Sequence, residues 1–97
     1  PSAAIELPDG TIVTGKTTAL MGACSNALIN ALKALGSIAD ELHLLSPEVI
    51  TPIQNLKTHH FGSVNPRLHT DEMLLALSVC AVNDPNAQLA LDQLDKL

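Results

Sequence analysis

Aromatic residues are almost missing from this chain. Phe61 is the only one among 97 residues, and there is no Trp or Tyr. Proteins that bind single-stranded nucleic acids stack the bases on aromatic rings, and this chain lacks such a platform. Basic residues are also few: the five Lys and Arg residues are scattered along a chain of net charge −5. Both scarcities argue against a nucleic-acid-binding module.

Long apolar runs are missing as well. The longest candidate, residues 18–35, is interrupted by Asn26, Asn30 and Lys33, so no segment stays apolar for the length that a bilayer requires. No signal peptide is visible in the sequence. We therefore expect a cytoplasmic protein without a membrane partner.

Cysteine is scarce too. Cys24 and Cys80 are the only two, they lie far apart, and both fall in apolar helical contexts. Such cysteines are usually buried, reduced thiols in a cytosolic protein. We expect this state for both, with a disulfide or a metal role as the alternative, and we predict no metal site and no cofactor.

What the chain does have is aliphatic bulk. Hydrophobic residues make up 46% of the sequence and charged residues 15%, which is typical of a globular domain. A chain of 97 residues can form one domain with a modest core. Because it starts at Pro1 rather than Met and stops at Leu97 directly after a charged pair, we expect residues 1–97 to be a single α/β domain fragment of a longer protein.

Turn signals and β-branched residues predict a hairpin at the start of the chain. Pro8-Asp9-Gly10 favours a tight turn between residues 3–7 and the β-branched run 11–14. A long, mostly apolar helix is predicted over 18–35, followed by a strand over 41–45. A strand, a helix and a strand in succession imply a parallel pair with a right-handed crossover. The predicted fold class is therefore α/β, with a small mixed sheet flanked by helices.

Three more helices are predicted in the second half of the chain. Ser46-Pro47 begins the first, and Pro52 should kink or restart it. A loop is expected over residues 58–67. The other two helices are expected over 73–82, opened by Thr70-Asp71-Glu72, and from Asp84-Pro85 to about residue 94.

One motif names a ligand class. Residues 10–17, Gly-Thr-Ile-Val-Thr-Gly-Lys-Thr, match the P-loop pattern of nucleotide-binding proteins. A working P-loop wraps phosphates with backbone N–H groups and favours small residues, whereas the four variable positions here are all β-branched. The next predicted strand also ends without an acidic residue for magnesium. We interpret the match as a coincidence of the hairpin, and P-loop-like nucleotide binding through Gly10–Thr17 is kept as an alternative function.

The second half of this motif still predicts an anion-binding site, though less specifically than a P-loop would. Gly15 to Thr18 lie at a predicted strand-to-helix junction, where unpaired N–H groups attract phosphate or carboxylate. Lys16, Thr17 and Thr18 are therefore candidate anion-binding residues. The alternative is that a threonine only caps the helix and that Lys16 is solvated.

Arg67 and His69 complete the candidate anion site. Arginine suits bidentate recognition of carboxylate or phosphate, and histidine can transfer protons near neutral pH. The alternative is a surface loop in which Thr70 caps the following helix. Asn26 and Asn30, on an otherwise apolar helix, are expected either to hydrogen-bond inside the domain or to face a cavity.

The predicted order of elements resembles that of the zinc nucleoside deaminases. Their two motifs, which carry the metal ligands and the catalytic Glu, would fall at Cys24–Leu28 and Pro47–Thr51. Here Asn26 stands in place of the catalytic Glu, and Glu48 and Thr51 stand in place of two ligand cysteines. Because zinc needs a full set of nitrogen and sulfur ligands, we expect a cytidine-deaminase-like topology without the zinc ligands.

Two longer segments resemble a known family. Residues 6–17, which include Glu6-Leu7-Pro8-Asp9-Gly10, and residues 65–72, Asn-Pro-Arg-Leu-His-Thr-Asp-Glu, are similar to the bacterial family called domain of unknown function 1846. Its members are several times longer, which implies a fragment of their C-terminal half with a deaminase-like topology. The resemblance implies no reaction and no catalytic residue.

The sequence thus leaves the function unknown and predicts part of a cytosolic bacterial enzyme or small-molecule-binding protein. Whether it is an enzyme stays open. An anionic small molecule would bind Lys16, Thr17, Thr18, Arg67 and His69. The alternative is an assembly module whose apolar helix, residues 18–35, packs against the remaining domains of the parent chain or against a second copy.

Overall fold

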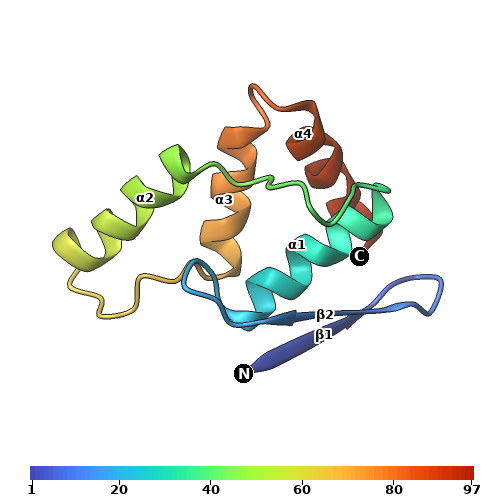
Figure 1. The fold of residues 1–97 in the computed structure, drawn as a ribbon, viewed down its shortest axis with the longest axis horizontal. Coiled ribbons are helices and arrows are strands. Elements are labelled where there is room, and N and C mark those ends of the chain that lie inside the picture. Colours follow the sequence, from blue (N-terminus) through green and yellow to red (C-terminus); the bar gives the residue numbers. More distant parts are fainter.

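A computed structural model describes residues 1–97 as a two-stranded hairpin and four α-helices. In Figure 1, α1 lies along the hairpin, α3 and α4 lie on the other side of α1, and α2 extends from one end. In chain order the elements are β1 (Ser2–Glu6), β2 (Ile12–Lys16), α1 (Ala23–Leu35), α2 (Pro47–Asn55), a π-helical turn (Leu56–His60), α3 (Thr70–Cys80), α4 (Pro85–Asp92) and a 3-10 turn (Gln93–Lys96).

The predicted hairpin is confirmed. β1 and β2 pair antiparallel, with Ala4 opposite Thr14. Gly10 has a φ of +89°, a conformation that favours glycine, and the Thr11 N–H donates a 2.9 Å hydrogen bond to Oδ1 of Asp9. The hydrogen bonds from Thr11, that of its backbone first, lower the pKa of the Asp9 carboxyl. The turn is therefore built by the residues that predicted it.

The P-loop interpretation fails on the same hairpin. Residues 12–16 all belong to β2, so they do not form a loop whose N–H groups could wrap a phosphate. The first glycine of the motif, Gly10, makes the turn. The second, Gly15, is buried beneath α1, and a Cβ there would lie 2.2 Å from the backbone nitrogen of Ala27. Both glycines are explained by the turn and by close packing.

The predicted third strand does not form. The sheet contains only β1 and β2, and residues 41–45 run without ladder pairing. The parallel pair is therefore absent, and with it the deaminase-like topology. In place of ladder pairing, the backbone carbonyls of Leu42 and of Asp40, just before this segment, accept hydrogen bonds from the Lys33 ammonium, at 2.5 and 3.1 Å.

The free edge of β2 is also occupied. The register pairs Leu7 with Thr11, so the carbonyls of Thr14 and Lys16 point away from β1. They accept hydrogen bonds from Nδ2 of Asn30 and Asn26, at 2.9 and 2.7 Å. Asn26, Asn30 and Lys33 form one polar stripe along α1, and this polar stripe bonds to the backbone where a third strand would have paired.

The helices differ from the prediction mainly at their ends. α1 begins at Ala23 instead of residue 18, because Thr18 Oγ1 accepts hydrogen bonds from the N–H groups of Leu20 and Met21 and holds a separate turn. α2 continues past Pro52, and the π-helical turn takes up the start of the predicted loop. None of the helices combines the length and the apolar character needed to cross a bilayer.

The core lies where α1, α3 and α4 meet. Leu32 of α1 and Met73 and Leu77 of α3 are fully buried there. Within α1 only Cys24 and Ala34 are exposed, so the apolar surface of this helix is used inside the domain. The prediction of an assembly module required the apolar helix at 18–35 to be free to pack against other domains. That helix is already covered within this domain.

We predict that Gly15→Ala lowers the free energy of unfolding by about 3 kcal/mol, because the added methyl group forces α1 away from β2. Gly22→Ala is the matched control. A Cβ at Gly22 would have no heavy atom within 4 Å, and its φ of −69° suits alanine. We expect it to cost less than about 1 kcal/mol. Urea unfolding followed by circular dichroism measures both, and equal losses would contradict the close approach at Gly15.

Candidate functional site

The helix N-terminus predicted beside Lys16 is not there. α1 starts at Ala23 with Gly22 as its N-cap, so Lys16 and Thr17 do not flank the free N–H groups of the helix. Lys16 ends β2 as an exposed residue, and the Thr17 N–H donates a hydrogen bond to the carbonyl of Pro1 at 3.2 Å. The physical basis for placing an anion at this junction is therefore missing.

Arg67 and Thr18, by contrast, do meet. Nε of Arg67 donates a 2.7 Å hydrogen bond to the Thr18 carbonyl, which ties the loop before α3 to the turn before α1. His69 is exposed at the N-terminus of α3, as its N-cap residue in place of the predicted Thr70. Of five hollows in the surface, Thr18 lines one, and none is lined by Lys16, Thr17, Arg67 or His69. The predicted residues do not converge on one concave site.

An ion pair between the buried Lys57 and the half-buried Glu72 explains how Arg67 and His69 are placed. The Lys57 side chain, on the π-helical turn, donates hydrogen bonds to the Glu72 carboxylate at 2.8 Å and to the Arg67 carbonyl. The same carboxylate oxygen accepts a 2.8 Å hydrogen bond from the His69 N–H. Sequence reasoning missed Lys57, because a lysine near the end of a short helix carries no local signal of burial.

The pKa of Glu72 reflects this network. Burial alone would raise it, but the hydrogen bond from Lys57, the hydrogen bond from the His69 N–H and the Lys57 charge together bring the pKa below its ordinary value of 4.5. A carboxyl with a lower pKa in the folded state stabilises the fold above its unfolded pKa. That contribution disappears as the pH falls through the folded pKa.

A groove of about 420 Å³ lies between the polar stripe of α1 and residues 40–45. It continues into an adjoining hollow of about 320 Å³, which reaches the start of α2. The polar lining of the groove consists of Thr18, Asn26, Asn30, Lys33, Asp40 and His43, and the apolar lining consists of Ala19, Leu20, Met21, Ile29, Leu44, Leu45 and Ile50.

Lys33 gives this groove its chemistry. The residue is 8% exposed, yet no carboxylate lies within 4.0 Å of its ammonium, since the Lys57–Glu72 pair is the only ion pair in the structure. Two of its three donors are used by the carbonyls of Asp40 and Leu42. A buried charge without a counter-ion costs free energy. One donor of the Lys33 ammonium is thus left at the groove, which Asp40 also lines without forming an ion pair with Lys33.

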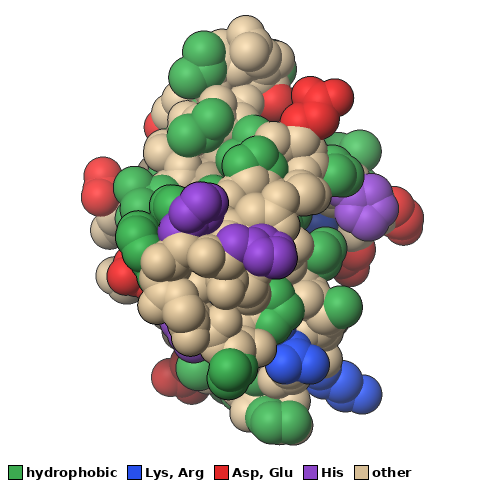
Figure 2. All heavy atoms as spheres, turned by 90° about the vertical axis from the view of Figure 1, so that its left-hand side faces the viewer, with side chains coloured by type: hydrophobic (Ala, Val, Ile, Leu, Met, Phe, Trp, Pro, Cys, Tyr) green, Lys and Arg blue, Asp and Glu red, His purple; other side chains and the backbone are tan.

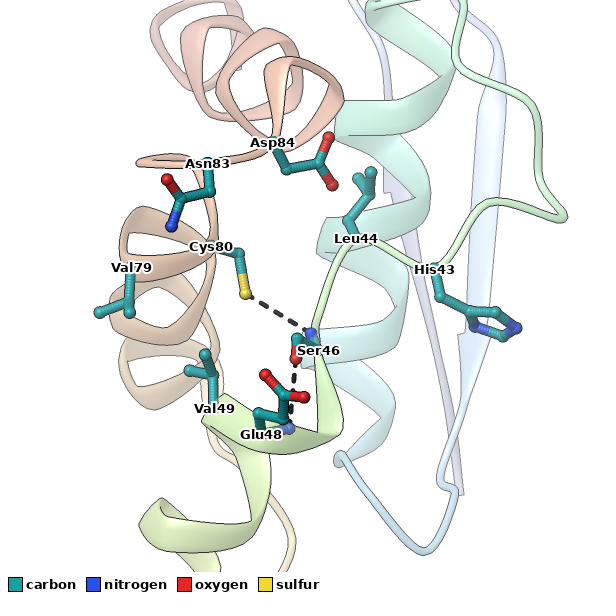
Figure 3. A pocket seen from close by; sticks show the side chains of 9 residues that line it. All are labelled: His43, Leu44, Ser46, Glu48, Val49, Val79, Cys80, Asn83 and Asp84. Carbon is teal, nitrogen blue, oxygen red and sulfur yellow. Dashed lines mark hydrogen bonds between the residues drawn. The ribbon is translucent and has the colours of Figure 1, made fainter.

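A second hollow, of about 290 Å³, lies between the start of α2 and the loop before α4 (Figure 3). Cys80 points into it, and its Sγ accepts a hydrogen bond from the Ser46 N–H at 3.5 Å, whereas the His43 ring points away. Ser46 and Asp84 are already used as the N-caps of α2 and α4. Within the structure, no three His, Cys, Asp or Glu side chains are grouped so that they could hold a metal ion.

The two cysteines are free and unpaired. Cys80 is half-buried, but Cys24 is exposed on α1, so the prediction that both are buried is wrong for Cys24. The apolar residues around Cys24 predicted burial, but the Cys24 side chain lies on the narrow outward face of the helix.

We predict that Glu72→Gln lowers the free energy of unfolding at pH 7 by roughly 2 kcal/mol, because it leaves the buried Lys57 ammonium without its counter-ion. The difference from the wild type should persist down to about pH 4.5 and disappear as the pH falls through the lowered pKa of Glu72. Urea unfolding between pH 7 and pH 3 measures it. Glu41→Gln, at an exposed acid without a salt bridge, is the control. A difference that stays constant with pH would contradict the role of the Glu72 charge.

Comparison with known proteins places the chain in a family. The model described as "Domain of unknown function DUF1846, C-terminal" matches residues 1–97. The chain is 64% identical to UPF0371 proteins of Corynebacterium aurimucosum and Corynebacterium diphtheriae, and 50% identical to a UPF0371 protein of Streptococcus uberis. Each alignment covers all 97 residues of this chain but 20% of the relative. The resemblance carried by residues 6–17 and 65–72 is confirmed, and the chain belongs to the DUF1846 family as its C-terminal domain.

Proposed function

We propose that this domain binds a small organic anion in the groove beside the polar stripe of α1. The observation that carries the proposal is Lys33, a buried ammonium that lines the groove and has no carboxylate partner. A bound carboxylate or phosphate ester would place a negative charge beside the Lys33 ammonium and accept a hydrogen bond from its remaining N–H. Thr18, one of the candidate residues from the sequence, lines the same groove.

The walls of the groove favour a ligand with an aliphatic body. Beyond Lys33 they are formed by side chains such as Leu20 and Leu45, and the adjoining hollow continues past Ile50. The groove volume of about 420 Å³ falls among those of small-molecule sites, roughly 300–1,000 Å³. A short aliphatic carboxylate or phosphate ester matches the free donor of Lys33 and the apolar lining.

Binding, rather than catalysis, is the role that the residues support. His43 is exposed at the rim and makes no hydrogen bond to another side chain, so nothing orients it as a base. The lining contains no hydroxyl or thiol paired with a histidine or a carboxylate. The proposed role of this domain is to hold an anionic molecule, and any reaction would need groups from the rest of the parent chain.

Hexanoate is the first probe of this proposal. We expect it to bind and to raise the melting temperature, whereas hexylammonium, of the same length and opposite charge, should not. Lys33→Met keeps a long aliphatic side chain but removes the charge, and we expect it to raise the Kd for hexanoate at least about tenfold, roughly 1.4 kcal/mol. Isothermal titration calorimetry measures the Kd.

Lys16→Met is the matched control, because it removes an exposed lysine that lies outside the groove. Circular dichroism of both variants distinguishes a lost site from a lost fold. Equal binding of hexanoate to the wild type and to a folded Lys33→Met variant would rule out Lys33 as the anion partner. Binding of hexylammonium to the wild type as tightly as hexanoate would also rule it out.

A further inference from the structure

A strip of apolar side chains is exposed on α3, on the π-helical turn and directly after that turn. It consists of Leu56, Phe61, Leu75 and Val79, with exposed fractions of 44%, 73%, 66% and 55%. Phe61 is the only aromatic residue in the chain, and most of its ring is in solvent. We call these four residues the apolar strip.

The apolar strip makes α3 apolar on two sides. Its inner side contributes Met73, Ala76 and Leu77 to the core, while Leu75 and Val79 lie one turn apart on the outer side. A helix that is apolar nearly all round is usually covered on all sides. The outer side of α3 therefore looks like a surface that is covered in the parent protein.

Three residues of the apolar strip, Leu56, Phe61 and Leu75, also line a depression. A hollow of about 240 Å³ is lined by Leu56, Phe61, Leu75 and Ile53, together with the Lys57–Glu72 pair. That ion pair already satisfies both of its charges, so the hollow offers no free charge to a ligand. Figure 2 views the molecule from the end where α2 lies: hydrophobic side chains are scattered over this face among backbone and polar atoms, two histidines lie near its middle, and the Asp, Glu, Lys and Arg side chains lie mostly at its margin. An exposed aromatic ring beside an apolar hollow is typical of an interface between proteins or domains.

We propose that the apolar strip is the surface on which the preceding part of the parent chain packs. The chain spans 20% of the length of its relatives and matches a C-terminal domain, so a large region that precedes this domain could cover the apolar strip. The size of the surface also favours this occupant. Four partly exposed side chains present roughly 400 Å², about half of what each partner buries in a standard interface between free proteins. A tethered domain needs less area, because the linkage raises its effective concentration.

Photo-cross-linking in the full-length protein tests this proposal. Phe61→p-benzoylphenylalanine places a photoreactive group in the apolar strip. On irradiation we expect a product of monomer mass whose cross-linked peptide lies outside the 97-residue domain and precedes it. Adding Leu75→Asp and Val79→Asp should reduce that product at least fivefold, since both charges fall on the apolar strip and outside the core.

Ile12→p-benzoylphenylalanine is the control, because Ile12 is 57% exposed on the hairpin and is likewise apolar. It should give no such product. A product of dimer mass from position 61 would overturn the proposal, because it indicates a second copy of the chain. Cross-links confined to the domain, or no cross-link at all, would also overturn it, because the apolar strip would then face solvent. Equal yields of cross-linked product from positions 12 and 61 would contradict it as well.

Discussion

The hydrogen bonds from the polar stripe of α1 to the backbone are the interaction on which this structure depends. Asn26 and Asn30 bond to carbonyls of β2, and Lys33 bonds to carbonyls of residues 40 and 42. Backbone carbonyls of a sheet edge and of an extended segment need hydrogen-bond partners, and here a helix supplies them instead of a neighbouring strand. α1 comes close enough because Gly15 has no side chain in its path. The two-stranded sheet, the course of residues 40–45 and the groove with its charged lysine all follow from this arrangement.

Local signals were enough to predict the elements that are built locally. The turn at Asp9-Gly10 and the caps at Ser46 and Asp84 depend on residues close in sequence, and the structure shows all three. The third strand depended on a long-range competition. An apolar run such as 41–45 fits any half-buried extended segment, and it can join a sheet only if the edge of β2 is free. The asparagines of α1 occupy that edge, and no pattern within residues 41–45 records it.

Of the residues that the sequence offered as anion-binding candidates, only Thr18 lines the groove proposed as a binding site. Thr18 lies in the groove, but Lys16 and His69 are exposed outside it, and Arg67 is tied to a backbone carbonyl. Lys33 was visible in the sequence only as an interruption of an apolar helix. Its chemistry arises from burial without a carboxylate nearby, which depends on how distant segments fold around it. The motif at residues 10–17 matches the P-loop pattern without forming a P-loop, because its two glycines are required by a turn and by close packing against α1.

Amide hydrogen exchange at β2, followed by NMR, tests most directly whether side chains of α1 replace a third strand. The N–H groups of Val13 and Gly15 point toward β1, whereas those of Thr14 and Lys16 point to the open edge. The account predicts slow exchange at Val13 and Gly15 and fast exchange at Thr14 and Lys16. Slow exchange at Thr14 and Lys16, together with slow exchange within residues 41–45, would show a paired third strand and contradict it.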